Sequence, residues 1–515
     1  MKQEEASLTE TAHPFLAMKG ITKSFGPVTA NQLVDLDLKR GEIHGLVGEN
    51  GAGKTTLMNV LYGLYAPDQG EILIEGEPAE IASPHHAISR GIGMVHQHFM
   101  LVPTLTVIDN VLLGLQRGTD VILNRDQARE RLLELAETYG LRVNPDAYIW
   151  QLSVGDRQRV EILKALYREI QVLILDEPSA VLTPQESEEL FHTIRRLVQE
   201  GLSVIFITHH LEEALEISDR ITVLRDGRVV GTRESGETDK KELANLMVGR
   251  EVLFRLERKP YPEEDQPVIL RVEDLVVRGD RDTRAVKGVS FEVRRGEIVG
   301  VAGVDGNGQS ELVQALTGLR RAEGGWFSVN GRELTNQSPR VILESGVGHI
   351  PEDLDHSLID EFSLIENLML DRHYSRTFSN RGVLRQGLME AEARRLIEAY
   401  DVRTPGETVK AGTLSGGNKQ KLVVSREVSR EPVLMIAAHP TRGLDIGAEE
   451  YVRSTLLACR QEGMAILLVS TKLDEILSLS DRILVMARGE IMGEREAQEA
   501  DVNEIGLMMA GTNAP

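Results

Sequence analysis

The sequence predicts an α/β protein of two similar halves, each built on a mainly parallel β-sheet flanked by helices. Three observations lead to this prediction: the length of the chain, its internal repetition, and its alternation of apolar and helix-forming segments. At 515 residues, the chain is too long for a single hydrophobic core. Its 41% hydrophobic and 4% aromatic residues are ordinary for such a fold, and no apolar run approaches the roughly 18 residues that span a bilayer.

The internal repetition emerges when the chain is aligned with itself. The triplet Gly-Glu-Ile at 41–43 recurs at 296–298, which is an offset of 255 residues. Ser153 matches Ser415 at an offset of 262, so the second half carries seven extra residues between positions 352 and 415. We expect these residues in a surface segment, because insertions are tolerated there.

The predicted domains are residues 14–251 and 268–512, joined by a linker at 252–267. The linker contains three prolines and a cluster of acidic residues, which is typical of a short extended connection. Within the first half, apolar runs such as 43–47 alternate with helical segments such as 187–200. This alternation predicts a mainly parallel sheet covered by helices.

A phosphate-binding loop follows the apolar run at 43–47. Residues 48–55 read GENGAGKT and open a predicted helix at 55–64, which is the context that this motif requires. The glycines allow backbone N–H groups to turn toward phosphates, Lys54 supplies a positive charge for the β- and γ-phosphates, and Thr55 offers a hydroxyl to Mg²⁺. A simple glycine turn would need neither the lysine nor the helix.

Two acidic residues end the apolar run at 172–175. At the tip of a buried strand, Asp176 would hold Mg²⁺ through water, and Glu177 would polarise an attacking water. Two acids after a strand, taken alone, are more often the start of a solvated loop. Together with a phosphate loop, the catalytic interpretation is favoured.

The motifs of the first half follow a recognisable order. After the phosphate loop come Gln97, Leu-Ser-x-Gly from Leu152, Asp-Glu-Pro at 176–178, and Thr208-His209. This ordered set resembles the ATPases of ABC transporters, and the resemblance covers nearly the whole chain, twice. It implies two tandem P-loop NTPase domains, each with an antiparallel β subdomain and a helical subdomain that carries the signature motif.

The resemblance also implies roles for single residues. Gln97 would link the Mg²⁺ site to transmembrane subunits, His209 would contact the γ-phosphate, and Phe25 would stack on adenine. The expected catalytic residues are Glu177, His209 and Gln97. The expected Mg²⁺ ligands are Thr55, Gln97 and Asp176. The expected ATP contacts in the first half are Phe25, Gly48, Glu49, Asn50, Gly51, Ala52, Gly53, Lys54, Thr55 and Thr56.

The second half has lost most of these groups. By the two offsets, the aligned pairs are Phe25 with Asp280, Lys54 with Gln309, Asp176 with Ala438, Glu177 with His439, and His209 with Thr471. Losing one charged hydrogen bond to phosphate costs about 1.5–3 kcal/mol, and losing a general base costs about 10²–10⁴ in rate. We therefore expect slow hydrolysis there. We interpret His439 as a structural or weak nucleotide contact, because Ala438 leaves little to hold Mg²⁺ beside it.

The second half retains a signature that the first half has altered. Residues 414–418 read LSGGN, whereas 152–156 read LSVGD, which places a branched side chain and a negative charge where a phosphate would approach. In the ABC ATPases that the chain resembles, the halves dock head to tail, and each nucleotide lies between one phosphate loop and the other signature. The resemblance thus implies one competent site, whose signature contacts are Ser415, Gly416, Gly417 and Asn418.

Further segments indicate which group of ABC ATPases the chain resembles most. Residues 161–168, 180–184 and 440–445 are similar to the ATPase subunits of bacterial importers for simple sugars and nucleosides. Residues 61–65 and 94–100 look most like the nucleoside branch, which depends on a basic membrane lipoprotein. Import of a monosaccharide such as ribose or galactose is the alternative. In this family the ATPase does not touch the cargo.

The resemblance also implies partners and a location. Such subunits work with two transmembrane permeases and an external substrate-binding lipoprotein. Segments 97–110 and 352–367 are expected to dock onto the permeases, which would make the chain a peripheral subunit on the cytoplasmic side of the cell membrane. The N-terminal segment MKQEEASLTETAH lacks the basic and apolar regions of a signal peptide.

Three other functions fit less well. A soluble twin-cassette ABC ATPase acting on ribosomes would keep catalytic acids in both halves and carry a longer, basic linker. An ABC ATPase of DNA repair would need long coiled-coil insertions, for which the interval from Lys54 to Ser153 leaves no room. Nucleic-acid binding is disfavoured because the net charge is −22 and no continuous run of Lys and Arg is present.

Overall fold

The chain divides into two compact units, residues 1–252 and 253–515. The computed structural model describes residues 14–26, 28–115, 125–179, 182, 184–251, 261, 266–280, 283–354, 357–509 and 511. Most of the predicted linker lies outside the described residues, and the predicted domain limits stay a prediction. In the described part of the chain, no helix is both long enough and apolar enough to cross a membrane.

Unit 1 is built on a six-stranded sheet with the strand order β10-β9-β3-β8-β7-β6. The neighbouring strands from β9 to β6 run parallel, and only β10 is antiparallel to its neighbour. All residues of β3, β7 and β8 are buried, which explains their continuous apolar sequences. The strands are β3 (Ile43–Val47), β6 (Ile92–Val95), β7 (Val172–Asp176), β8 (Ser203–Thr208), β9 (Arg220–Arg225) and β10 (Arg228–Glu234).

The two faces of this sheet pack into different hydrophobic clusters. Leu173 and Phe206 belong to the cluster that contains α3, α4 and α5, whereas Ile174 and Ile205 belong to the cluster that contains α1 and the antiparallel sheet. Neighbouring residues of a strand point to opposite faces, so each apolar strand joins both clusters. The helices are α1 (Lys54–Leu61), α2 (Pro84–Ser89), α3 (Val107–Leu112), α4 (Arg125–Tyr139), α5 (Val154–Leu166), α6 (Pro184–Gln199), α7 (Leu211–Ile217) and α8 (Lys240–Val248).

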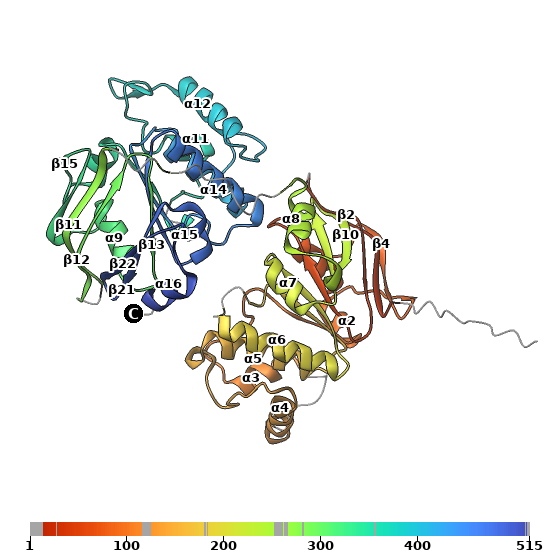
Figure 1. Cartoon of the computed structure of the whole chain (residues 1–515). Helices are drawn as coiled ribbons and strands as arrows, with labels where there is room; N and C mark the ends of the chain where they lie inside the picture. The colour runs from red at the N-terminus through yellow and green to blue at the C-terminus, as the bar shows by residue number, and fades with distance from the viewer. Residues whose placement is uncertain are drawn as a thin grey trace, which may run out of the picture. The chain divides into compact units, whose positions relative to one another are not determined.

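A second, antiparallel sheet of unit 1 has the order β2-β1-β4-β5. Figure 1 shows α3, α4 and α5 together at one end of the unit, away from β2 and β4. The strands are β1 (Leu16–Phe25), β2 (Val28–Leu38), β4 (Gln69–Ile74) and β5 (Glu77–Pro78). The predicted combination of a mainly parallel sheet, an antiparallel sheet and a helical region is therefore confirmed.

Unit 2 repeats both sheets, with the orders β16-β19-β20-β13-β21-β22 and β12-β11-β14-β15. The larger sheet is again parallel except at its edge strand β22. The strands are β11 (Val268–Arg278), β12 (Arg284–Arg294), β13 (Ile298–Ala302), β14 (Ala322–Val329), β15 (Arg332–Glu333), β16 (Val347–Ile350), β19 (Leu434–Ala438), β20 (Ala465–Ser470), β21 (Arg482–Ala487) and β22 (Glu490–Glu496). The helices are α9 (Gln309–Leu316), α10 (Pro339–Glu344), α11 (Leu364–Met369), α12 (Gln386–Ala399), α13 (Gly416–Val428), α14 (Ile446–Gln461), α15 (Leu473–Leu479) and α16 (Val502–Met509).

The extra residues of the second half lie largely between α11 and α12. This interval spans 370–385, whereas the interval between α3 and α4 spans only 113–124. It contains the antiparallel hairpin of β17 (Ser379–Asn380) and β18 (Val383–Leu384). Residues 381–388 are all exposed, so the insertion is a surface segment as expected.

Two predicted helix boundaries differ from the structure. The helix predicted at 187–200 is α6, which spans Pro184–Gln199. The helix after the phosphate loop was expected at 55–64, but α1 begins at Lys54 and ends at Leu61. The following Gly63 has a φ of 77°, a left-handed conformation that ends a helix.

Candidate active site

The phosphate loop of unit 1 joins β3 to α1 through two glycines in the left-handed region. Gly51 and Gly53 have φ values of 84° and 99°. A Cβ atom at Gly53 would lie 2.3 Å from the carbonyl oxygen of Ala30, which is far too close for any side chain. Glycine is therefore required here, and the sharp turn lets α1 begin directly at Lys54.

Lys54 lies buried against its own loop. Its Nζ donates hydrogen bonds to the carbonyl oxygens of Gly48 (2.7 Å) and Glu49 (3.1 Å). In the neighbouring position, Thr55 Oγ1 lies 3.5 Å from Asp176 Oδ1. The loop thus holds an ammonium group and a hydroxyl beside the end of β7, which are the groups that a phosphate with a bound metal ion requires.

Asp176 is buried at the end of β7. Burial raises its pKa to about 6, against the opposing effect of the hydrogen bond from Thr55. A buried carboxylate without a full counter-charge, next to a hydroxyl, provides the oxygen ligands that Mg²⁺ prefers. The donor set therefore fits the predicted ion.

Glu177 is held by two side chains from two other strand ends. Gln97 follows β6, and its Nε2 donates a 2.8 Å hydrogen bond to Glu177 Oε2. His209 follows β8, and its Nδ1 lies 2.9 Å from Glu177 Oε1. Burial raises the pKa of Glu177, but the hydrogen bond and charge of His209 outweigh it and the pKa is lowered. The three expected catalytic residues are thus brought together, and the carboxyl is kept ionised as a base requires.

Phe25 lies at the end of β1 and is 44% exposed. Its neighbour Tyr65 was not expected from the sequence; the ring centroid of Tyr65 is 5.1 Å from that of Phe25 at an interplanar angle of 76°. Exposed aromatic faces suit base stacking, and the edge-to-face pair orients the Phe25 ring. The sequence signal for this pair is an aromatic residue two positions after Gly63.

A second group that was not expected from the sequence, the Glu213 carboxyl, joins the catalytic loops. Glu213 on α7 accepts hydrogen bonds from Ser179 Oγ (2.6 Å) and Thr208 Oγ1 (3.1 Å). These residues flank the Asp-Glu-Pro motif and His209, so one carboxyl group ties both loops. The sequence does carry a signal for this contact: at the offset of 262, unit 2 again has two hydroxyl residues and a glutamate. They are Thr441, Ser470 and Glu475.

The phosphate loop of unit 2 has the same backbone shape, but a glutamine side chain takes the place of the lysine. Gln309 is buried where Lys54 stands in unit 1, and in the part of the chain that the structure describes its Nε2 has no hydrogen-bond partner. A Cβ at Gly303 would lie 2.2 Å from this nitrogen, so the amide fills the loop tightly. The loop is therefore preserved without the positive charge.

The remaining positions of this second site are also rearranged. Glu352, in the place of Gln97, forms an ion pair with Arg442 and accepts a 3.4 Å hydrogen bond from Ser310 Oγ. His439 is buried, and burial lowers its pKa. At the position of Phe25, Asp280 pairs with the guanidinium of Arg320 at 2.6 Å. Ion pairs thus stand where unit 1 has its catalytic glutamine and its exposed aromatic ring.

In the altered signature of unit 1, the serine is hydrogen-bonded within the motif. Ser153 Oγ donates to Asp156 Oδ2 (2.9 Å) and accepts from the backbone N–H of Asp156 (3.1 Å). Arg159 holds the same carboxyl at 2.9 Å. The hydroxyl hydrogen of Ser153 is therefore engaged by an anion, and the next residue, Val154, carries a branched, exposed side chain.

The signature of unit 2 leaves its serine able to donate. Ser415 Oγ accepts a 2.9 Å hydrogen bond from Asn418 Nδ2, and Asn418 Oδ1 accepts from the backbone N–H of Arg403 at 2.8 Å. A Cβ at Gly416 would meet no atom within 4 Å, so the backbone there faces open space. The N-terminus of α13 therefore offers an uncovered backbone and a donating hydroxyl, which suits an anion.

Comparison with known proteins agrees with this geometry. The model of a family described as "ABC transporter" matches residues 32–180 and 286–442. The chain belongs to the ABC transporter family. It is an ATP-binding ATPase subunit with two cassettes, and the resemblance inferred from the motifs is confirmed.

Three relatives align over nearly their whole length. The chain is 48% identical to the nucleoside import ATP-binding protein NupA of Lactococcus lactis, over 97% of this chain and 98% of that protein. It is 48% identical to the guanosine import ATP-binding protein NupO of Bacillus subtilis, over 96% and 97% of the two chains. It is 46% identical to the glucose import ATP-binding protein TsgD13 of Haloferax volcanii, over 97% and 96%.

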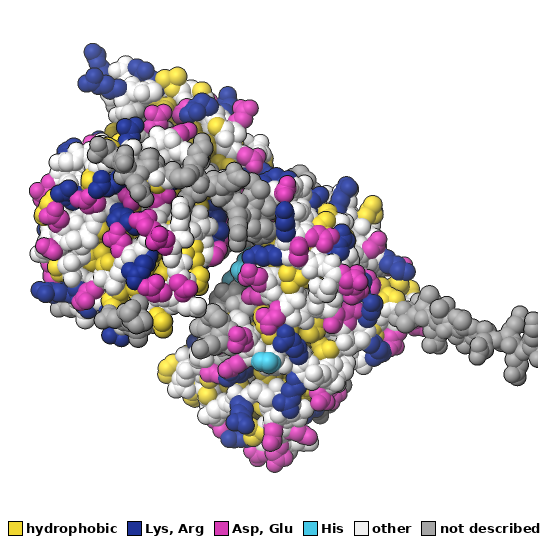
Figure 2. Space-filling model, in the orientation of Figure 1, with side chains coloured by type: hydrophobic (Ala, Val, Ile, Leu, Met, Phe, Trp, Pro, Cys, Tyr) yellow, Lys and Arg dark blue, Asp and Glu magenta, His cyan; other side chains and the backbone are white. Residues whose placement is uncertain are grey.

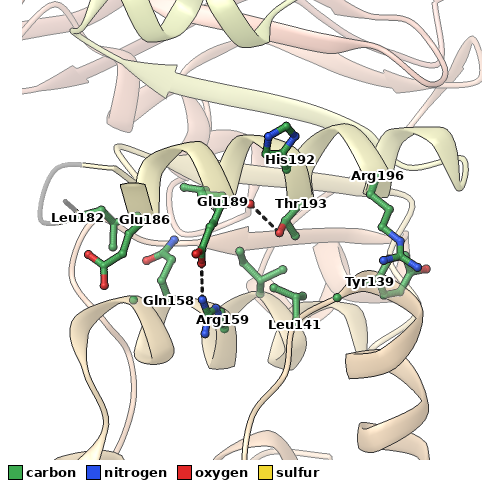
Figure 3. A pocket seen from close by; sticks show the side chains of 14 residues that line it. Tyr139, Leu141, Gln158, Arg159, Leu182, Glu186, Glu189, His192, Thr193 and Arg196 are labelled. Atoms are coloured by element: carbon green, nitrogen blue, oxygen red, sulfur yellow. Dashed lines mark hydrogen bonds and ion pairs between the residues drawn. The ribbon is translucent and has the colours of Figure 1, made fainter. Parts of the chain in front are cut away.

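A cavity of about 310 Å³ in the first cassette lies apart from the phosphate loop, between α5 and α6 (Figure 3). Its wall includes Leu141 and Ile162, and Arg159 on α5 pairs with Glu189 on α6 at 2.6 Å across it. Gln158 also lines the cavity, and its buried Nε2 has no partner among the described residues. The signature helix α5 thus leaves a cavity between itself and α6, with an unbonded amide in its wall.

The corresponding glutamine of the second cassette, Gln420, is hydrogen-bonded. Replacement by methionine should therefore change stability differently at the two positions. Gln420 Nε2 donates a 2.7 Å hydrogen bond to the carbonyl oxygen of Pro440. Gln420→Met should lower the free energy of unfolding by about 1–3 kcal/mol, because a buried acceptor loses its donor, whereas Gln158→Met should be neutral or stabilising. Chemical unfolding of the full-length variants measures both. Equal destabilisation would contradict the difference in bonding.

Proposed function

We propose that this chain is the ATP-hydrolysing subunit of an importer for nucleosides and that it has one competent ATP site. The observation that carries the proposal is the ionised Glu177 held between Gln97 and His209, beside a loop that contains Lys54. The second cassette has none of these groups in place. Two of the three relatives described above are named as nucleoside or guanosine import proteins, which supports the choice of cargo.

The proposed reaction follows from the groups around the first loop. Lys54 and the N-terminus of α1 bind the phosphates of ATP, and Phe25, oriented by Tyr65, stacks on adenine. Thr55 and Asp176, with Gln97, would hold Mg²⁺, which would neutralise phosphate charge. Glu177 accepts a proton from the attacking water, while His209 keeps the carboxyl oriented. We further propose that Ser415–Asn418, rather than the altered signature at 153–156, serves the bound ATP.

The proposed partners are two transmembrane permeases, with an external substrate-binding lipoprotein acting through them. The chain would then be peripheral to the cell membrane on its cytoplasmic side, docked through 97–110 and 352–367. Import of a monosaccharide is the second candidate, which is favoured by the similarity to a glucose import protein.

The cargo can be tested with the assembled transporter. ATP hydrolysis by the complex should rise when the binding lipoprotein is loaded with a nucleoside and stay at its basal level with ribose, galactose or glucose. Stimulation by a sugar alone would replace the nucleoside assignment by the monosaccharide one.

Docking can be tested in the same complex, because Phe99→Ser should reduce co-purification of the permeases. The control is Val28→Ser on the exposed part of β2, and intact assembly of the Phe99 variant would argue against docking at 97–110.

A further inference from the structure

One segment of the second cassette has a charge opposite to that of the protein. Residues 372–389 contain four arginines and no Asp or Glu, within a chain whose net charge is −22. The arginines are spaced and not consecutive, so they do not form a continuous basic run. The segment includes the β17–β18 hairpin, which belongs to the insertion that the first cassette lacks.

Three of these arginines have no internal role. Arg376, Arg381 and Arg385 are exposed, and within the described residues no hydrogen bond or ion pair engages their side chains. The fourth, Arg372, is bonded to the carbonyl oxygen of Arg426 at 3.0 Å and to Ser429 Oγ at 2.6 Å.

The next exposed arginines along the chain behave differently. On α12, Arg394 Nε donates to Glu407 Oε1 at 2.6 Å, and Arg395 forms two 2.8 Å bonds to Glu392. The two exposed arginines of α12 are thus paired with carboxylates, whereas, in the part of the chain that the structure describes, those of the hairpin are not.

Exposed aliphatic side chains lie among the unpaired arginines. Val383 is 70% exposed, and Leu384 and Leu388 are each 47% exposed. Figure 2 shows Lys and Arg side chains beside hydrophobic ones at the end of unit 2 that carries α12. The hairpin is ordered by a 2.8 Å hydrogen bond from Arg385 N to the carbonyl oxygen of the buried Phe378. It therefore presents apolar and cationic groups together on a defined turn.

We propose that this hairpin binds the anionic phospholipid surface of the cytoplasmic leaflet. Basic side chains are attracted to the anionic headgroups, while aliphatic side chains enter the boundary between headgroups and acyl chains. The rest of this acidic protein would be repelled by the same surface, so contact requires a locally reversed charge. The proposal adds a direct lipid contact to the proposed function, in which attachment comes through the permeases.

The main competing partner is a permease, and electrostatics favours the lipid. Cytoplasmic loops of membrane proteins carry an excess of Lys and Arg. A surface of that charge would repel Arg376, Arg381 and Arg385, whereas the cytoplasmic leaflet is negative. Stable anchoring needs more than one signal, so the hairpin contact should be weak and should assist assembly with the permeases.

The test uses the purified full-length protein and vesicles. The wild-type protein should co-sediment with vesicles that contain phosphatidylglycerol and not with vesicles of phosphatidylcholine. Each arginine near the surface contributes about fivefold to binding, so Arg381→Gln with Arg385→Gln should weaken it about 25-fold. Raising the salt concentration from about 0.05 M to about 0.5 M should also release the protein. Val383→Ser with Leu384→Ser should lower binding without changing this salt dependence.

The matched control removes the same charge from α12. Arg394→Gln with Arg395→Gln lowers the net charge by the same amount but leaves the hairpin intact, so it should weaken vesicle binding clearly less than the hairpin variant does. Basal ATPase activity checks that each variant is folded. The proposal fails if the wild-type protein does not bind anionic vesicles or if the two double variants bind equally. It also fails if the hairpin variant keeps vesicle binding but loses the permeases, since the partner is then a protein.

Discussion

Glu177→Gln is expected to abolish nearly all ATP hydrolysis by the assembled transporter, whereas His439→Ala should change it little. The two residues occupy equivalent positions with nearly the same left-handed backbone, φ 47° and 46°. Only Glu177 has a hydrogen-bonded glutamine and histidine around an ionised carboxyl. Loss of a general base typically costs about 10²–10⁴ in rate.

The measurement is steady-state phosphate release by complexes that contain equal amounts of each variant. Binding of ATP should survive in the Glu177 variant, because Lys54 and the phosphate loop are untouched, and retained binding separates a catalytic loss from misfolding. If His439→Ala reduces hydrolysis as much as Glu177→Gln does, the proposal of one competent site is wrong.

Asp176→Asn is expected to stabilise the nucleotide-free first cassette while it abolishes hydrolysis. The folded state raises the pKa of Asp176 from 3.8 to about 6, chiefly through burial. Below pH 3.8 the carboxyl is protonated in both states. As the pH rises through about 6, the folded protein must ionise a buried group, and the stability that protonation contributed is lost. At neutral pH the neutral amide should raise the free energy of unfolding by about 2–3 kcal/mol.

Thermal and chemical unfolding at several pH values without nucleotide will measure this gain. It should be largest above about pH 6 and shrink as the pH falls toward 3.8. Glu177→Gln is the control, because His209 lowers the pKa of Glu177 and its removal relieves no such cost. A stabilisation of Asp176→Asn that does not depend on pH would mean that improved packing, and not charge, is its cause.

The phosphate loop illustrates what could be predicted from sequence. Its function depends on a short run of residues with a fixed spacing, so GENGAGKT identifies both the loop and the helix behind it. The duplication was predictable for the same reason, because the order of residues along the chain is itself the evidence. The end of α1 was predicted less well, since a helix end depends on one local conformation at Gly63.

The signature motifs depend on contacts that a local sequence pattern does not predict. Asp156 was identified as an unfavourable charge near a phosphate, but the structure shows that it also binds the hydroxyl of Ser153. The bracing by Glu213 and the pairing of Tyr65 with Phe25 were not predicted. These contacts join residues that are distant in the chain or whose partner depends on rotamer choice, and neither is encoded in a local pattern.

Two related ATP-binding halves, and the loss of the lysine and the acids from the second, can be recognised in the sequence, because identity and order are properties of the polymer. Which groups act together is defined only in the folded protein. The folded chain brings Gln97 and His209 onto Glu177 from three different strand ends. Among the described residues it leaves Arg376, Arg381 and Arg385 without carboxylate partners, while Arg394 and Arg395 are paired. The reason is physical: hydrogen bonds, ion pairs and pKa shifts depend on distances through space and on burial, which are defined only once the chain has folded.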